Sequence, residues 1–463
     1  YFENVYEVNT LDADAIPSTL EQINGISEIY FLGAVGENKQ DDIDELKRVE
    51  EAGIISFFRL VKYINHNIFR FRNIRVKVIT NDISVINGDE TIKPYGASIT
   101  GFVMSAAKEF SDMRFSMIDI EMEKLKTEKL KLIEMIVSEP YSKLTSVVAF
   151  RDGKRFERKL RMVDLPAVKE SPFKENGVYL IIGGAGGIGF ELSKYLAARY
   201  RARLIWIGRS NLGKEQEEKL NKIKESGGDA IYLKADVSGL ASMKEAVEKS
   251  LEHFGCINGV FHSAIVLQDK SIGNMDEETL RSVLKPKVEG SIILQKALSG
   301  IKLDFMVFFS SVQSFAANVG QSNYAAACTF KDAVSQYYNQ TESCPVWTIN
   351  WGYWGSTGVV AGEDYRKRMA SFGIHSIEPA EGIEAVMRIV GGPIHQVVAI
   401  KAERPVMESI GAEFDKTFRV YTKTHVPMDL VGKIVPPSIE TDKIACYREG
   451  FKAITEFSEL LCL

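Results

Sequence analysis

The sequence is poor in cysteine, and the cysteines it has follow no metal-binding pattern. Five are scattered through 463 residues without a C-x-x-C pair or an even pairing count. They are Cys256, Cys328, Cys344, Cys446 and Cys462. This argues against a disulfide framework and against a cysteine-rich zinc site, so we expect a reduced, cytoplasmic protein that binds no metal.

The sequence also lacks an excess of positive charge and a long apolar run. Its 57 Lys and Arg residues stand against 62 Asp and Glu residues, which gives a net charge of -5. A basic face for nucleic acid is therefore not expected. No apolar segment approaches the roughly 20 residues that span a bilayer, so we expect neither a nucleic-acid partner nor a membrane partner.

An initiator methionine is missing as well, because the chain starts at Tyr1, and no signal-peptide pattern follows. The chain ends on the apolar stretch FSELLCL, so we expect a segment of a longer polypeptide. At roughly 100–200 residues per domain, a chain of 463 residues predicts two or three domains.

The first 170 residues alternate short apolar runs with helical patterns. ISEIYFLGAV and IRVKVITND read as buried strands on either side of an amphipathic helix. This alternation predicts an α/β fold with a parallel sheet, and Asp152-Gly153 predicts a hairpin turn after it. The first strand ends in Gly33 and Gly36 without the full glycine pattern. Residues 1–170 are therefore predicted to form a Rossmann-like unit without a phosphate site.

A complete dinucleotide-binding pattern opens the second unit, residues 171–402. An apolar strand, VYLII, runs through a glycine-rich loop into a helical pattern. Glycines there let the backbone approach a pyrophosphate, whose charge sits at the helix N-terminus. Tight turns use glycines too, but the position between strand and helix favours a cofactor site. The loop residues are Gly184, Ala185, Gly186, Gly187, Ile188 and Gly189.

Polar residues follow the next two predicted strands. Arg209 and Ser210 end RLIWIGRS, where a protein that prefers NAD usually carries an acid for the ribose hydroxyl. A cation suits the 2′-phosphate of NADPH, and a solvated surface arginine is the alternative. Asp236 and Val237 end IYLKADV, at the rim where open α/β sheets bind ligands. Asp236 could also cap a helix.

The candidate chemistry centres on a tyrosine near the start of a predicted helix, SNYAAACTFKDA. Tyr324 can donate a proton to an alkoxide if a nearby cation lowers its pKa from about 10, and a serine can share the oxygen. Ser311 stands thirteen residues earlier, at the end of the strand FMVFFSSV. Lys331 lies about two helical turns from Tyr324, which is rather far. Lys287 is the better candidate for the cation.

In their order and spacing, these motifs resemble the ketoreductase domains of modular polyketide synthases, which belong to the short-chain dehydrogenase/reductase superfamily. The resemblance rests on GGAGGIG, IGRS, ADVS, KPKVEG, FFSSV, GQSNYAAAC and NWGYWGSTG. It implies two Rossmann-like, doubly wound parallel-sheet subdomains. The first is degenerate and structural, and the second binds NADPH and is catalytic.

The resemblance also implies roles for single residues. Tyr324 would be the proton donor and Ser311 would orient the substrate carbonyl. Lys287 would lower the pKa of the tyrosine and join the proton relay. The family normally has asparagine where this chain has Cys328, and a thiol is a weaker hydrogen-bonding group than an amide. We expect activity to survive, because the three residues nearest the chemistry remain.

Two loops of the family carry over to this chain. Ser263 and Ala264 belong to a loop over the cofactor, in which Ile265 replaces a more usual glycine. The pattern Leu-x-Asp that ends at Asp269 marks B-type reductases, which form 3R products, and Gln321 stands where A-type reductases have tryptophan. Asp269 could instead cap a helix.

A third loop, rich in Gly and Trp, passes the nicotinamide in the family and contains Trp354. By resemblance Trp354 faces the substrate, and the following EDYRKRMASFG forms a mobile lid over the substrate entrance. Ordinary core packing is the alternative for Trp351 and Trp354.

The tail, residues 403–463, holds no cofactor motif. A proline-containing linker, VPMDLVGKIVPPSIETD, precedes CYREGFKAITEFSELLCL, which has an amphipathic helical pattern. The tail could lead into a neighbouring synthase domain, and a packing helix is the simpler expectation.

The sequence thus predicts an NADPH-dependent reductase that converts the β-keto group of a chain tethered to an acyl carrier protein into a β-hydroxyl group. Neighbouring synthase domains are the other expected partners. Two alternatives stay open. One is a free-standing short-chain reductase, which the degenerate first unit argues against. The other is a catalytically inactive scaffold domain, which Cys328 favours and the intact motifs oppose.

Overall fold

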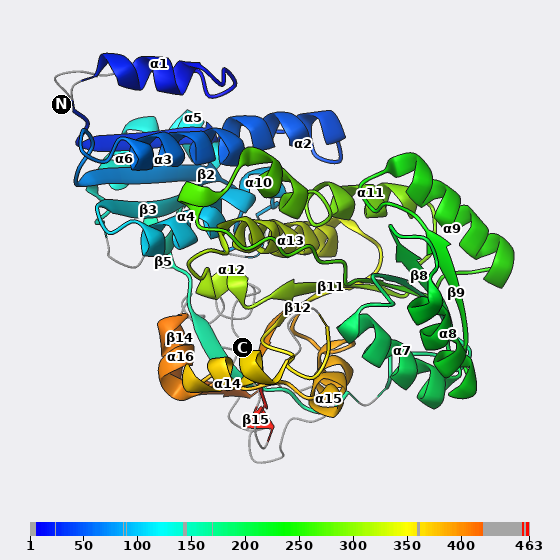
Figure 1. Ribbon diagram of the computed structural model, residues 1–463. Coiled ribbons are helices and arrows are strands. Elements are labelled where there is room, and N and C mark those ends of the chain that lie inside the picture. Colours follow the sequence, from blue (N-terminus) through cyan, green and yellow to red (C-terminus); the bar gives the residue numbers. More distant parts are fainter. Residues whose placement is uncertain are drawn as a thin grey trace.

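The protein is described from a computed structural model of the chain, in which two sheets lie on either side of a long central helix (Figure 1). The structure describes residues 6–23, 25–86, 88, 90–141, 146–168, 170–358, 362–419, 456–457 and 460–462.

The first sheet has five strands in chain order, β1-β2-β3-β4-β5, of which β1 to β4 are parallel and β5 is antiparallel to β4. The predicted strands and the hairpin turn are confirmed, and Asp152 and Gly153 have the positive φ angles of 49° and 72° that this turn needs. The strands are β1 (Glu28–Ala34), β2 (Ile74–Asn81), β3 (Met113–Ile120), β4 (Val147–Arg151) and β5 (Lys154–Glu157). The helical segments are α1 (Ala15–Gln22), α2 (Ile43–Glu50), η1 (Glu51–Ile55), α3 (Ser56–His66), η2 (Pro94–Gly96), α4 (Ser98–Glu109), α5 (Met122–Thr127) and α6 (Lys129–Ser138).

The carboxyl edge of this first sheet is filled by the protein itself. Arg151 donates to the Asp119 carboxylate at 2.6 Å, and both side chains are buried. The carboxylate also accepts from the backbone N–H groups of Ile83 and Ser84 at 3.1 Å each. The strand order never reverses, so the crevice in which doubly wound sheets bind dinucleotides does not form here.

The second sheet has the order β15-β16-β13-β12-β11-β10-β7-β8-β9 and is parallel from β13 to β9. Together the two sheets confirm the predicted α/β class with two Rossmann-like units. The strands are β7 (Val178–Ile182), β8 (Arg203–Gly208), β9 (Asp229–Lys234), β10 (Gly259–His262), β11 (Phe305–Ser311), β12 (Val346–Trp351) and β13 (Gln396–Ile400). The helical segments are α7 (Gly187–Tyr200), α8 (Lys214–Glu225), α9 (Leu240–Phe254), η3 (Ile272–Asn274), α10 (Glu277–Leu284), α11 (Glu289–Ala297), α12 (Gln313–Ala316), α13 (Ser322–Thr341), α14 (Glu363–Ser371) and α15 (Pro379–Ile389).

Helix α13 joins the two units, because it packs on β11 and β12 on one side and on α4 of the first unit on the other. The approach of α4 requires glycine at position 101. A Cβ atom on Gly101 would lie 2.3 Å from the carbonyl oxygen of Ala325 and 2.7 Å from the nitrogen of Ala326. One apolar core, which includes Phe102 and Phe330, therefore runs through both units.

The last part of the chain differs from the sequence prediction. The linker and most of the predicted packing helix lie outside the described residues. The described end of that segment forms strands, β15 (Glu456–Phe457) and β16 (Leu460–Cys462), and β16 pairs antiparallel with β13. The helix prediction is wrong there, because the open edge of β13 offers backbone partners that a sequence pattern does not reveal.

The start of the tail returns to the connection between the two units. Helix α16 (Arg404–Ser409) leads into β14 (Ala412–Arg419), which pairs parallel with β6 (Leu160–Asp164). Met407 and Ala412 share a small buried cluster with Leu160. The predicted division of the chain at residues 170 and 402 stays a prediction.

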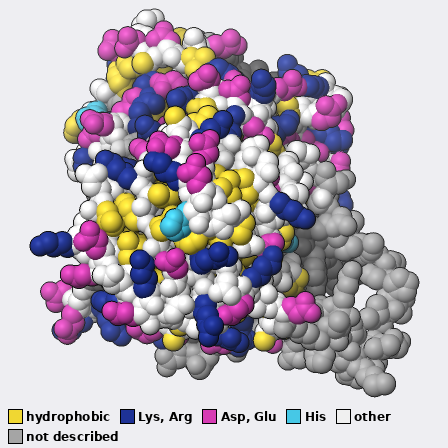
Figure 2. Space-filling view, turned by 90° about the vertical axis from the view of Figure 1, so that its right-hand side faces the viewer, with side chains coloured by type: hydrophobic (Ala, Val, Ile, Leu, Met, Phe, Trp, Pro, Cys, Tyr) yellow, Lys and Arg dark blue, Asp and Glu magenta, His cyan; other side chains and the backbone are white. Residues whose placement is uncertain are grey.

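The surface carries mixed charge. On the face shown in Figure 2, dark blue Lys and Arg side chains alternate with magenta Asp and Glu side chains, without a broad field of one sign. Within the described ranges, no helix combines the length and the hydropathy needed to cross a membrane.

Gly101→Ala tests the close contact between α4 and α13. In an ordinary helix interior alanine is more stable than glycine by about 1 kcal/mol. Here we expect the added methyl group to lower the free energy of unfolding by about 1–3 kcal/mol, because it meets backbone atoms that cannot give way. Denaturant unfolding measures the change. The control is Gly53→Ala, whose new Cβ would lie 3.5 Å from Ala34, an ordinary contact. If Gly101→Ala were as stable as the parent, the contact would not constrain the packing.

Candidate active site

The strand order of the second sheet reverses between β7 and β10, and the predicted cofactor loops follow these two strands. Their carboxyl ends meet at one edge, where open α/β sheets bind ligands. Ser263 donates its N–H to Ile182 at 2.9 Å. A Cβ on Gly183 would touch Ala264 at 3.3 Å. The two loops therefore lie side by side.

The glycine loop has the close packing that its sequence predicted. Gly183 has a φ of 77°, which favours glycine. A side chain at Gly184 would come within 2.2 Å of Trp206, and one at Gly189 within 2.6 Å of the Gly183 carbonyl. Among the described residues, no side chain caps the N-terminus of α7. Its first N–H groups therefore suit a pyrophosphate, and the residues present fit a dinucleotide.

Arg209 and Ser210 follow β8 directly and are exposed, so they can reach a ligand at the same edge. Asp236 follows β9 and accepts hydrogen bonds from the N–H of Ser238 at 2.9 Å and from its hydroxyl at 2.6 Å. It shapes the turn before α9, whose N-cap residue is Gly239, so Asp236 is not the helix cap of the alternative interpretation.

The three predicted catalytic residues meet above the end of β11. Ser311 is the last residue of that strand, and Tyr324 is the third residue of α13. Ser311 lies close enough to the Tyr324 hydroxyl group to lower its pKa. Lys287 precedes α11, and its Nζ lies 5.3 Å from the centre of the Tyr324 ring. All three side chains are buried.

Burial raises the pKa of Tyr324 well above 10.0, and the neighbouring Cys328 raises it further, whereas the hydrogen bond from Ser311 lowers it. Burial also raises the pKa of the Cys328 thiol, although Lys287 opposes this. Both groups therefore carry their protons at neutral pH. The lowering of the tyrosine pKa that the sequence predicted is not found, because burial dominates, but the protonated tyrosine can still donate.

Lys331 is a second buried lysine near these residues, although its spacing along the helix predicted a position rather far from Tyr324. The Nζ of Lys331 lies 2.9 Å from His262 Nδ1, 3.0 Å from the His262 carbonyl and 3.1 Å from the Phe309 carbonyl. Burial lowers its pKa well below 10.5, and so does Lys287. Helical spacing predicts that Tyr324, Cys328 and Lys331 lie on one face of α13. It does not predict the partner of Lys331, because His262 lies on β10.

The predicted stereocontrol residues lie together. Gln321 donates to the Asp269 carboxylate at 2.7 Å, and Asn323 donates to the Gln268 carbonyl at 2.8 Å. Val266 and Leu267, in the same loop, pack against the buried cluster that contains Tyr324 and Cys328. Helix α10 begins instead with Asp276 as its cap, so Asp269 does not serve as a helix cap.

Trp354 lies in a different environment. It is buried, its ring meets that of Trp351 edge-on at 5.1 Å, and it fills the space beside Gly382 of α15. This is the core packing that was the alternative for Trp351 and Trp354. A substrate role for Trp354 stays a prediction.

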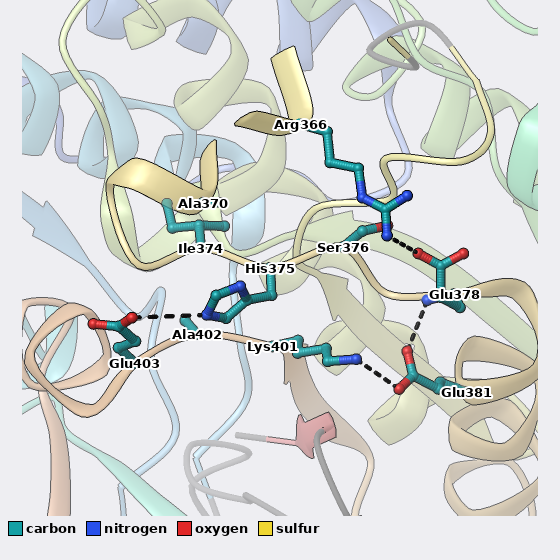
Figure 3. Close-up of a pocket in the computed structure, with 10 residues that line it drawn as sticks. All are labelled: Arg366, Ala370, Ile374, His375, Ser376, Glu378, Glu381, Lys401, Ala402 and Glu403. Carbon is teal, nitrogen blue, oxygen red and sulfur yellow. Dashed lines mark hydrogen bonds and ion pairs between the residues drawn. The ribbon is translucent and has the colours of Figure 1, made fainter. Parts of the chain in front are cut away.

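A pocket of about 770 Å³ lies beneath α14 (Figure 3), and Tyr324, Ser311 and Lys287 are not among the residues that line it. Its basic side chains each lie near a carboxylate: Arg366 is 3.5 Å from Glu378, Lys401 is 2.8 Å from Glu381, and His375 is 3.9 Å from Glu403. Helix α14, which lies over this pocket, has no buried residue. A helix that is so weakly attached to the rest of the protein suits the predicted role as a lid.

Comparison with known proteins agrees with the motifs. The family model for the KR domain matches residues 177–356. Polyketide synthase PksN of Bacillus subtilis is 35% identical over 414 residues, which cover 89% of this chain and 7% of PksN. Polyketide synthase ThaG of Burkholderia thailandensis is 31% identical over 395 residues, which cover 85% of this chain and 7% of ThaG. The chain thus spans a small fraction of the length of these relatives.

Solved structures share the fold. An N-terminal ketoreductase from the macrolactin assembly line has a TM-score of 0.72 at 22% identity, covering 89% of this chain and 82% of its own. A ketoreductase domain from the bacillaene assembly line has a TM-score of 0.67 at 23% identity, covering 89% and 97%. The first ketoreductase of the tylosin polyketide synthase has a TM-score of 0.69 at 24% identity, covering 87% and 84%.

The buried His262 predicts a loss of stability in mild acid. Burial, Lys331 and Lys287 hold its pKa well below 6.5 in the folded protein. The unfolded chain therefore takes up a proton as the pH falls below 6.5, and the folded chain does not. We expect His262→Gln to remove a pH dependence of about 1.4 kcal/mol per pH unit below that value.

Denaturant unfolding at pH 7.5 and pH 5.0 measures this slope. His66→Gln, at the exposed last residue of α3, is the control and should keep the slope of the parent protein. An unchanged slope in His262→Gln would show that His262 does not stay neutral in the folded state.

Proposed function

The chain is a ketoreductase domain of the polyketide synthase family, and we propose that it reduces the β-keto group of an acyl chain on an acyl carrier protein to a β-hydroxyl group with NADPH. The observation that carries this proposal is the convergence of Tyr324, Ser311 and Lys287 beside a glycine loop that fits a dinucleotide.

The cofactor would be held by residues at the carboxyl edge of the second sheet. Residues 184–189 would cradle the pyrophosphate at the start of α7. Arg209 and Ser210 would bind the 2′-phosphate, Asp236 and Val237 would flank the adenosine end, and Ser263 with Ala264 would line the nicotinamide end. When bound, NADPH supplies the hydride for the substrate carbonyl.

The side chains of this site supply the proton and hold the substrate oxygen. Ser311 donates a hydrogen bond to the carbonyl oxygen and so orients it. Tyr324 transfers its phenolic proton to that oxygen as negative charge develops. The ammonium group of Lys287, over the ring, stabilises the phenolate that remains. Cys328 is fully buried in the same cluster as Tyr324.

The configuration of the product would follow from the loop beside the tyrosine. Gln321 donates to Asp269 at 2.7 Å, and Leu267 packs against the cluster that contains Tyr324. This arrangement supports the B-type assignment and hence a 3R hydroxyl group.

An acyl carrier protein is the proposed partner, together with the neighbouring domains of a synthase. Tethering raises the effective concentration of the substrate, so the site needs few contacts with the chain itself. Helix α14, which has no buried residue, is the proposed lid over the substrate entrance.

Tyr324→Phe tests the reaction. With NADPH and a β-ketoacyl pantetheine thioester, we expect the parent protein to consume NADPH. The variant should lose about 10²–10⁴-fold in kcat, because the proton donor is gone and the ring packing is kept. Loss of NADPH absorbance measures both rates, and chiral analysis of the product tests the 3R assignment. Tyr337→Phe, on the same helix, should turn over like the parent.

A different result would favour the scaffold alternative, which rests on Cys328 at the usual asparagine position. That result is NADPH binding without turnover by the parent protein, on both the thioester and an acyl carrier protein substrate. Equal activity of parent and Tyr324→Phe would instead remove the tyrosine from the mechanism.

Arg209→Gln tests the choice of cofactor. Removing the guanidinium group should raise the KM for NADPH about tenfold or more and leave the KM for NADH nearly unchanged, since only NADPH carries the 2′-phosphate. Steady-state rates with the two cofactors give the ratio. Arg201→Gln, at the opposite end of α7, is the control and should keep the preference of the parent. A parent protein that uses both cofactors equally would contradict the role of Arg209.

A further inference from the structure

The last turn of α4, in the first unit, reaches across to the loop before the catalytic helix. Ser105 donates to the carbonyl oxygen of Asn318 at 2.8 Å. Lys108 donates to the carbonyl oxygen of Ala316. The first unit therefore holds residues 316–321, the segment that leads into Tyr324.

Glu109 completes this turn and contacts two loops at once. Its Oε1 accepts the backbone N–H of Gly320 at 2.8 Å, and its Oε2 accepts the backbone N–H of Ile272 at 2.8 Å. Hydrogen bonds from backbone N–H groups to a carboxylate are charge-assisted and stronger than neutral ones. One side chain of the first unit thus fixes the distance between segments 265–272 and 316–321 of the second.

These two segments flank the catalytic tyrosine. The first contains Leu267, which packs against the small cluster of Val283, Tyr324 and Cys328, and Asp269, which accepts a hydrogen bond from Gln321 of the second segment. A change in their separation therefore moves the walls on both sides of the substrate carbonyl.

The second segment also needs to be held. Ala317 has a φ of 40°, in the left-handed region that residues with a Cβ rarely adopt. Such a conformation persists where surrounding contacts impose it. The contacts that surround Ala317 include those of Lys108 and Ser105 with its neighbours on either side.

We propose that Glu109 is a positioning residue for the reduction: it clamps segments 265–272 and 316–321 together and thereby determines which face of the keto group the site presents. This proposal rests on the proposed reductase function. It gives the first unit, which lacks a cofactor site, a direct part in the selectivity of the second.

The chemistry of the clamp requires a carboxylate. Both partners of Glu109 are N–H donors, and a carboxylate offers an acceptor oxygen to each. A glutamine offers one acceptor oxygen and an NH₂ group, which faces the other N–H group as a second donor. Glu109→Gln therefore keeps the size of the side chain and releases one of the two segments, whereas Glu109→Ala releases both.

Hydrogen exchange tests the clamp without any turnover. In Glu109→Ala we expect amides in both segments to exchange about tenfold faster than in the parent protein. In Glu109→Gln at least one segment should respond, and in Ser105→Ala only residues 316–321. Asp112→Ala, an exposed acid three residues further on, is the matched control and should match the parent. Unchanged exchange of both segments in a folded Glu109→Gln protein would overturn the clamp.

Product analysis tests its consequence. With a β-ketoacyl pantetheine thioester, we expect Glu109→Gln and Glu109→Ala to shift the ratio of the two hydroxyl epimers about tenfold toward the minor one. Cofactor KM should stay within about twofold, because Glu109 contacts Ile272 and Gly320 and not the glycine loop or residues 263 and 264. Ser105→Ala should shift the ratio less.

The outcomes separate the two proposals. A parent protein that binds NADPH and never turns over would defeat the reductase function, and hydrogen exchange would still decide the clamp. Faster exchange with an unchanged epimer ratio and an unchanged substrate KM would show a merely structural role for Glu109, and the proposal would fail. If Glu109→Ala does not fold, Glu109→Gln decides both measurements.

Discussion

The close packing of α4 on α13 is the contact on which the rest of the molecule depends. It is possible because Gly101 has no side chain, so two helices from different sheets meet at backbone distance. Helix α13 carries Tyr324, and α4 carries Glu109, so one interface holds the proposed proton donor and the proposed clamp. Because both units share one apolar core, the position of Tyr324 depends on the packing of both units.

Several ionisable groups are buried around Tyr324. An isolated charge is unfavourable in a buried environment, and hydrogen bonds offset this free-energy cost. Lys331 finds three acceptors on β10 and β11. The ring of Tyr324 lies under Lys287, and Ser311 lowers the pKa of the Tyr324 hydroxyl group. The same burial that raises the pKa of the phenol keeps it protonated until charge develops beside it.

The two sheets differ in strand order, and this difference determines which of them suits a cofactor. The second sheet reverses its order between β7 and β10, and the loops that follow these two strands suit a dinucleotide. The first sheet keeps chain order, and the Arg151–Asp119 pair fills its carboxyl edge. It contributes through its helices instead, and α4 contacts the loops around the site.

Features that depend on neighbours in the chain were determined by the sequence alone. The strands, the glycine loop at residues 184–189 and the hairpin at Asp152 and Gly153 follow from local periodicity and from φ preferences. Tyr324 and Ser311 could be paired because motif spacing resembles a known family. Only the tertiary structure brought Lys331 to His262 and Glu109 to Gly320 and Ile272, and only it paired β16 with the edge of β13. These partners are far apart in the chain. Such contacts form only when folding brings distant segments together, so no local sequence pattern predicts them.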